Sequence, residues 1–232
     1  MKGAEKARGD EKIGREARGQ MKLYDRHTSP NCQRTRVVLY EKNLSYQTIP
    51  VDLVKKEQKR PEFLKMNPYG KVPVLVDGDT IVYESCIINE YIEEKYPNPP
   101  LLPKEPGLRA KIRILIDYGV NRTYPAYERL RNEMLKVESE RNLAVISEAR
   151  HELKGLLQRF EDEIGAQPYL AGDFSLLDAA VIPRFLRIEA WGPLADPALP
   201  RLIGWLQRMK GRPSIQKIIA SGMPQSHTMK AG

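Results

Sequence analysis

The sequence has few cysteines, few aromatic residues and no long apolar run. Its two cysteines, Cys32 and Cys86, are too few for the disulfide framework of a small secreted domain. No stretch approaches the roughly 18 apolar residues that a membrane-spanning helix requires. The first twenty residues contain one large aliphatic side chain, Ile13, and therefore lack the apolar region of a secretory signal. These absences indicate a cytoplasmic protein without a membrane segment.

Histidine is also scarce, and the charge balance is basic. His27, His151 and His227 have no metal-ligand spacing, so no metal site is expected. The net charge of +8 permits attraction to anionic partners. However, the one dense basic run, residues 55–60, has no interleaved aromatic residues, and direct nucleic-acid binding is not predicted. With 232 residues, the chain suits one large domain or two small ones.

The first part of the chain predicts a β-α-β unit. Residues 21–24 and 45–49 suit short strands, and residues 32–42 between them follow a helical pattern that ends at Asn43. A length of about thirty residues is the scale of a right-handed crossover between two parallel strands.

Residues 67–92 predict a loop, a hairpin and a helix. Asp77-Gly78 lies between two β-rich runs and is typical of a tight turn. Pro73 suits the first position of a strand, where no N–H group is needed for the ladder. The helix that follows is expected to bury four side chains, those of Ile87, Ile88, Tyr91 and Ile92. Together with the β-α-β unit, this pattern predicts a thioredoxin-like α/β domain over residues 21–97.

A proline-rich segment separates this part from one with helical patterns alone. Prolines cannot continue a helix, so we place a linker over residues 98–107. Apolar residues then recur at helical spacing. Pro125 is expected to bend or divide the first of these helices. Ser175 and Asp178 are expected to form a capping box at the start of a later helix. The sequence therefore predicts three further segments: an all-helical domain over 108–221, a disordered extension over 1–20 and a loose tail over 222–232.

Two motifs carry a resemblance to a known family. Asn67-Pro68-Tyr69-Gly70-Lys71-Val72-Pro73, followed by Glu84-Ser85, resembles the glutathione-binding half of glutathione transferases, and the similarity extends over nearly the whole chain after Met21. The resemblance implies a thioredoxin-like domain followed by an all-α domain, a homodimer and a role in detoxification. Such an enzyme binds glutathione as co-substrate, stabilises its thiolate, and conjugates or reduces a small electrophilic substrate.

Ser29 is the candidate catalytic residue. It precedes the first helix in Ser29-Pro30-Asn31-Cys32, where a serine can cap the first turn. The same geometry allows its hydroxyl to donate to a thiolate, and the helix N-terminus adds positive potential. The resemblance favours the second role, because serine-type and cysteine-type glutathione transferases have the thiol-activating or thiol-bonding residue at this place. Thr28 is the neighbouring alternative.

The resemblance also implies a set of glutathione-binding residues. Val72-Pro73 resembles the family's cis-proline step, at which the residue before proline pairs its backbone with the cysteinyl backbone of glutathione; a trans proline at a strand start is the alternative. Ser85 suits the γ-glutamyl carboxylate and Glu84 the ammonium group; an ordinary helix cap is the alternative. Lys71 and Arg60 are candidates for the glycyl carboxylate, and each is otherwise a surface cation.

Two more residues are secondary candidates. Cys32 lies in the first turn of the predicted helix, where a lowered thiol pKa would support removal of glutathione from mixed disulfides. The alternative is that Cys32 packs as a small apolar side chain, as Cys86 is expected to do. Tyr118 is a candidate for the acceptor pocket, together with Tyr124, Tyr127 and Trp191, although aromatic residues at helical spacing usually belong to a core.

The chain is also similar to a relative that is not a transferase. Glu84-Ser85-Cys86-Ile87-Ile88 and Tyr96-Pro97-Asn98-Pro99-Pro100-Leu101 resemble stringent starvation protein A, which keeps the fold but acts by binding RNA polymerase. Asn98 departs from that pattern, which typically has histidine between the prolines, and Ser29 keeps the transferase pattern. A non-catalytic regulator with RNA polymerase as partner is therefore the alternative function.

Overall fold

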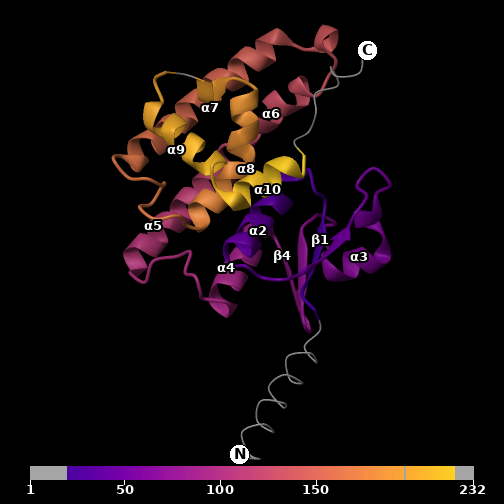
Figure 1. Ribbon diagram of the computed structural model, residues 1–232. Coiled ribbons are helices and arrows are strands. Elements are labelled where there is room, and N and C mark those ends of the chain that lie inside the picture. The colour runs from indigo at the N-terminus through magenta and orange to yellow at the C-terminus, as the bar shows by residue number, and fades with distance from the viewer. Residues whose placement is uncertain (1–19, 196, 223–232) are drawn as a thin grey trace, which may run out of the picture.

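The computed structural model describes residues 20–195 and 197–222 (Figure 1). The extension predicted over 1–20 lies outside the described residues except for Gln20. The tail predicted over 222–232 lies outside them except for Gly222. Among the described helices, none combines the length and the apolar character needed to cross a membrane.

A four-stranded sheet forms the centre of the first part, in the order β2-β1-β3-β4. β1 pairs in parallel with β2 and antiparallel with β3, and β3 pairs antiparallel with β4. The parallel pair needs a crossover connection, which contains α2. The elements are β1 (Lys22–Asp25), α2 (Pro30–Glu41), β2 (Gln47–Pro50), a short 3₁₀ turn (Glu57–Lys59), α3 (Pro61–Met66), β3 (Val74–Asp77), β4 (Thr80–Tyr83) and α4 (Ser85–Lys95). The predicted α/β arrangement is confirmed.

Two glycines allow the turns on either side of β3. Gly78 has a φ of +62° in the β3–β4 hairpin, a backbone conformation that glycine adopts at little cost. Gly70 has a φ of +58°, and a Cβ added there would lie 2.7 Å from the Gln58 carbonyl oxygen. The loop before β3 therefore requires glycine at this position. The Val72–Pro73 peptide bond that follows is cis, as the family resemblance implies.

Every helix-or-strand element of the second part is helical among its described residues, and one isolated β-bridge joins Tyr169 and Gly172. Its elements are α5 (Pro106–Asp117), a π-helical turn (Tyr118–Arg122), α6 (Tyr124–Met134), a 3₁₀ turn (Glu138–Glu140), α7 (Leu143–Ile164), α8 (Leu176–Ala190), a 3₁₀ turn (Pro193–Ala195), α9 (Pro200–Lys210) and α10 (Pro213–Ala220). Pro125 stands at the start of α6, so it divides the helix as predicted. The predicted capping box of Ser175 and Asp178 opens α8. The all-helical character of this part is confirmed, and the exact domain limits stay predictions.

Helix α2 lies at the junction of the two parts. Figure 1 shows α2 and α4 between the sheet and the helical part, and α3 on the opposite face of the sheet. α8 packs against α2, and every residue of α8 from Leu176 to Ile188 is buried. One apolar cluster continues from Leu23 of the sheet to Trp205 of α9. This shared core fixes the N-terminus of α2 relative to α6 and α8.

One predicted core residue lies on the surface instead. The exposed fraction of Ile87 is 58%, whereas Ile88 and Ile92 are fully buried and Tyr91 is half-buried. Successive helical residues point about 100° apart, so residues four apart share a face. α4 turns the face of Ile88 and Ile92 inward, which leaves Ile87 outside.

Candidate functional site

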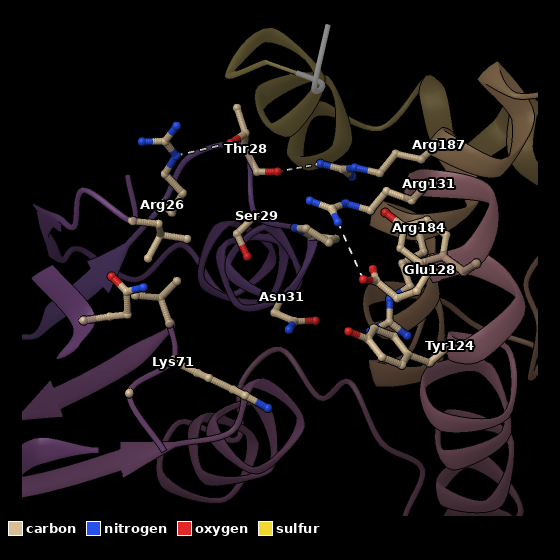
Figure 2. Close-up of a pocket in the computed structure, with 16 residues that line it drawn as sticks. Arg26, Thr28, Ser29, Asn31, Lys71, Tyr124, Glu128, Arg131, Arg184 and Arg187 are labelled. Atoms are coloured by element: carbon tan, nitrogen blue, oxygen red, sulfur yellow. Dashed lines mark hydrogen bonds and ion pairs between the residues drawn. The ribbon is translucent and has the colours of Figure 1, made fainter. Parts of the chain in front are cut away.

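A cleft of about 470 Å³ opens between the first turn of α2, the loop before β3, and helices α6 and α8 (Figure 2). Ser29 and Asn31 at the start of α2, and Lys71 and Val72 in the loop, line it from the first part. The helical part contributes Tyr124, Tyr127, Glu128, Arg131, Arg184 and Arg187. Because both parts supply walls, the cleft exists only in the folded chain.

Ser29 caps α2 and also faces the cleft. Its φ and ψ are extended, and its Oγ accepts a hydrogen bond from the backbone nitrogen of Cys32 over 3.5 Å. Pro30 is the first helical residue, where its missing N–H costs nothing. Ser29 therefore caps the helix, which is one of the two roles expected for it from the sequence. Capping uses a lone pair of Oγ and leaves the hydroxyl proton available, so this geometry also permits donation to a thiolate in the cleft.

A small hollow beside the cleft brings together five predicted glutathione-binding residues. Its lining consists of Asn31, Asn67, Lys71, Val72, Pro73, Glu84 and Ser85. Asn31, Lys71 and Val72 also line the cleft, so the two cavities are adjacent. Asn67 supports this wall, because its side-chain nitrogen donates to the Lys71 carbonyl oxygen over 2.7 Å.

Glu84 and Ser85 lie where β4 passes into α4. Glu84 has a φ of +67°, which is unusual for a residue other than glycine, and its exposed side chain makes no capping hydrogen bond. Ser85 is buried, and its Oγ accepts a hydrogen bond from Arg34 Nη1 over 2.7 Å. Glu84 therefore keeps its carboxylate for another partner, and strained positions of this kind concentrate at functional sites.

Arg60 and Tyr118 line neither the cleft nor the hollow. Arg60 is exposed and pairs with Glu57, 3.2 Å away. Gln58, in the 3₁₀ turn before Arg60, lines the cleft, and its buried Oε1 has no hydrogen-bond partner. Tyr118 instead donates its hydroxyl to the Leu156 carbonyl over 3.1 Å.

The other aromatic candidates divide between the cleft and the core. Tyr124 and Tyr127 line the cleft. Trp191 is buried and stacks on Tyr127, with ring centroids 5.8 Å apart. The helical pattern did not separate these tyrosines from Tyr118, because a one-helix pattern shows which face is apolar but not which part of it meets a cavity.

Cys32 is fully buried in a small cluster with Val51 and Phe63. Burial, and then the negative charge of Asp25, raise the pKa of its thiol well above the ordinary value. Both effects disfavour the thiolate, so the structure gives Cys32 the environment of a packed apolar side chain. Cys86 is half-buried, which makes it more accessible than the sequence suggested.

Sequence reasoning missed the arginines of the helical wall. Arg184 and Arg187 are both buried in α8, and Arg131 on α6 is half-buried. Arg187 donates to the Thr28 carbonyl over 2.7 Å and so connects α8 with the segment before Ser29. The available signal was a pair of arginines three residues apart in a mostly apolar helix, a spacing that places both on one face.

The fold and this site define a class of protein. A thioredoxin-like domain with a cis proline at its glutathione-type loop, followed by an all-α domain, is the arrangement of glutathione transferases. Residues 23–100 match the family "Glutathione S-transferase, N-terminal domain", and residues 120–213 match "Glutathione S-transferase, C-terminal domain". The chain belongs to the glutathione transferase superfamily.

Individual relatives agree with this assignment. Glutathione S-transferase 3 of Zea mays is 34% identical over 87% of this chain and 94% of the relative. The chain is also similar to a stringent starvation protein A homolog of Haemophilus influenzae, with 30% identity over 90% of this chain and 94% of that protein. Among solved structures, the theta class glutathione S-transferase of Xanthomonas axonopodis pv. citri with glutathione bound has a TM-score of 0.77 and 28% identity, and the match covers 88% of this chain and 99% of that one.

Proposed function

We propose that the protein is a glutathione transferase, which binds glutathione, stabilises its thiolate, and conjugates or reduces a small electrophile. The observation that carries this proposal is the position of Ser29 in the cleft, next to the hollow that contains Lys71, Val72 and Ser85. The relatives named as glutathione transferases support it. A cytoplasmic location and a role in detoxification are part of the same proposal.

The hollow offers a partner for each end of glutathione. The γ-glutamyl carboxylate binds at the N-terminus of α4, where Ser85 supplies a hydroxyl and its N–H group. Glu84 pairs with the γ-glutamyl ammonium group. Val72 aligns its backbone with the cysteinyl residue, and Lys71 meets the glycyl carboxylate. These contacts place the cysteinyl sulfur near the first turn of α2.

At that point the chain acts on the sulfur of glutathione. The Ser29 hydroxyl donates a hydrogen bond to the thiolate, and the positive end of α2 adds to the stabilisation. A thiol with an ordinary pKa of about 8.5 is mostly protonated at neutral pH, so a lowered pKa raises the fraction of nucleophile. The thiolate attacks an electrophilic carbon, the S–C bond forms, and the leaving group departs with the bonding electron pair.

Calorimetric titration with reduced glutathione tests the proposal. Wild-type protein is expected to show saturable binding, and Glu84→Ala is expected to abolish it. Ser29→Ala is expected to keep binding, to raise the pKa of the bound thiol, and to lower turnover. Glu62→Ala is a matched control, because Glu62 is an exposed carboxylate on α3 away from both cavities. Absence of binding at millimolar glutathione would contradict the proposal.

The homodimer common in this family is part of the proposal. Ile87 on α4 and Ile114 on α5 each have an exposed fraction of 58%, which is high for isoleucine and suits a covered surface. Ile87→Lys is expected to convert a dimer to a monomer in analytical ultracentrifugation. A wild-type protein that sediments as a monomer would exclude this interface.

Similarity to the stringent starvation protein A homolog supports one alternative, a non-catalytic regulator that binds RNA polymerase. The match spans almost the whole of that protein, so the likeness is not confined to the fold of one half. Affinity capture from a bacterial lysate, followed by identification of polymerase subunits, tests this function. Glutathione turnover combined with no captured polymerase would exclude it.

A further inference from the structure

The wall of the cleft formed by α6 and α8 has an excess of positive charge. Arg131, Arg184 and Arg187 line it, and Glu128 is the one carboxylate among the described residues that do so. Glu128 lies 3.6 Å from Arg131 on the same helix and offsets only part of this charge. Figure 2 shows the three arginines and Glu128 on the side of the cleft opposite Lys71.

The two arginines of α8 are buried without a carboxylate partner among the described residues. Arg187 donates to Gln33 Oε1, to the Thr28 carbonyl and to the Pro183 carbonyl. Arg184 donates to the Val120 carbonyl. These acceptors are all neutral. A buried cation is costly unless an anion accompanies it, so retained unpaired cations are typical of a binding site.

Two aromatic rings offset only part of the cost of burying the positive charge of Arg184. Its guanidinium carbon lies 4.9 Å from the ring centroid of Tyr124 and 5.5 Å from that of Tyr127. Burial and the neighbouring Arg34 nevertheless lower the pKa of Arg184 to about 10. That pKa is still well above neutral, so Arg184 remains a cation at a site where burial makes its charge costly, and an anion placed beside it would stabilise that charge.

Three buried polar atoms in this wall have no hydrogen-bond partner. They are Arg184 Nε, Arg187 Nε and the Tyr127 hydroxyl. Each can donate a hydrogen bond, and the two guanidinium nitrogens can do nothing else. Buried polar groups are usually satisfied, so unpaired donors on three residues that line one cleft favour a ligand with several acceptor oxygens.

We infer that the electrophilic substrate of this protein carries a carboxylate, and that the carboxylate binds against Arg131 and Arg184 at the helical wall of the cleft. The inference rests on the proposed function, because it names the substrate of the same site. A guanidinium matches the two oxygens of a carboxylate, and the Tyr124 ring beside Arg184 suits an adjoining aromatic ring.

The two proposed binding sites lie on opposite sides of the cleft. Lys71 and Ser85 belong to the wall formed by the first part, where glutathione is proposed to bind. Arg131 and Arg184 belong to α6 and α8 across the cleft, and Figure 2 shows Ser29 and Asn31 between the two sides. A carboxylate held by the arginines would direct the rest of the electrophile toward Ser29.

A matched pair of ligands tests the inference without requiring catalysis. Calorimetry compares a chloronitrobenzoate with the corresponding chloronitrobenzamide, which has the same ring and leaving group but no charge. Wild-type protein is expected to bind the benzoate about tenfold or more tightly than the benzamide, because hydrogen bonds to a charged group are the stronger ones. Equal affinities for the two ligands would overturn the inference.

Three variants test whether the wall formed by α6 and α8 causes the preference for benzoate over benzamide. Arg131→Gln is expected to remove most of the preference for benzoate, and Glu128→Gln is expected to increase it, because each changes the local charge by one unit. Arg129→Gln is the matched control, since Arg129 is exposed and pairs with Glu152 on α7. An unchanged preference in both Arg131→Gln and Glu128→Gln would overturn the inference even if the wild type prefers benzoate.

Titration of benzoate into protein saturated with glutathione separates this inference from the proposed function. Simultaneous binding of both ligands supports a carboxylate site distinct from the glutathione site. Mutually exclusive binding would show that the arginines serve the carboxylates of glutathione, which overturns the inference. Benzoate binding without any glutathione binding would support the carboxylate site and contradict the transferase. In the active enzyme, the thiolate forms the S–C bond and chloride leaves, so product formation reports the conjugation itself.

Discussion

Arg34 connects Ser85 to the helical part of the protein. Its Nη1 donates to Ser85 Oγ over 2.7 Å, and its Nε donates to the Ala180 carbonyl of α8 over 2.8 Å. Because Ser85 Oγ accepts the bond from Arg34, the hydroxyl proton of Ser85 is free to point to another acceptor. One buried guanidinium therefore orients the hydroxyl that the proposed glutathione site uses.

Ser85→Ala is expected to weaken glutathione binding about tenfold to a hundredfold, because a hydrogen bond to a charged carboxylate contributes about 1.5–3 kcal/mol. Ser85→Thr retains the hydroxyl and is expected to recover most of the affinity. Ser45→Ala, at an exposed serine away from both cavities, is the control. Calorimetry gives the affinities and thermal unfolding checks that the fold is intact. Unchanged affinity in a well-folded Ser85→Ala protein would show that the hydroxyl does not contact glutathione.

Alkylation of the native protein is expected to modify Cys86 and to spare Cys32. Cys32 is fully buried and the pKa of its thiol is raised by burial and by Asp25, so little thiolate is present at about pH 8. Mass spectrometry after treatment with iodoacetamide locates the modified residue, and both cysteines are expected to react in urea. Rapid modification of Cys32 in the folded protein would instead support removal of glutathione from mixed disulfides.

A buried ion pair secures the segment between α4 and α5. Lys42 Nζ lies 2.7 Å from Glu93 Oε2 and also donates to the Tyr96 and Pro99 carbonyls. Glu93 in turn accepts hydrogen bonds from the backbone nitrogens of residues 101 and 102. The pair thus replaces the missing helical hydrogen bonds of this proline-rich segment.

Glu93→Gln is expected to lower the free energy of unfolding by about 3–5 kcal/mol, because it leaves Lys42 buried without an anion. Urea unfolding followed by circular dichroism measures the change. Glu94→Gln is the control, since the neighbouring carboxylate is exposed and its loss is expected to change stability by less than about 0.5 kcal/mol. Similar effects of the two substitutions would contradict this account of the segment.

Asp77 is expected to make stability depend on acid pH. Burial alone would raise the pKa of Asp77, but hydrogen bonds from Lys95, Tyr96 and Tyr91 outweigh it and hold the pKa below its ordinary value. A carboxyl group with a lowered folded pKa contributes stability above the unfolded pKa of about 3.9, and loses that contribution as pH falls through the folded pKa. Asp77→Asn is expected to flatten the decline in unfolding free energy below about pH 4, as measured by urea unfolding at several pH values. An equally steep acid decline in the variant would show that other carboxyl groups cause it.

Local patterns in the sequence were sufficient to predict the two-part fold and the motif before β3. Periodicity of two in the strands and of 3.6 in the helices is a local property, so the α/β part and the helical part were both predictable. Turn and cap residues such as Gly78 and Ser175 act within a few positions of the chain, so the turns and helix starts that they form could also be predicted from the sequence. The motif from Asn67 to Ser85 indicated five residues that the folded chain brings into one hollow.

Which residues meet at the cleft depends on long-range packing and could not be read from local patterns. Ile87 and Ile88 are adjacent in sequence, but the rotation of α4 against the sheet exposes one and buries the other. Arg131 and Arg184 are far apart along the chain, and they share a wall only because the fold brings α6 and α8 to the same cleft. Burial and unpaired donors depend on everything packed around a group, so the charge of that wall, and with it the inferred carboxylate of the substrate, could not be obtained from the sequence pattern.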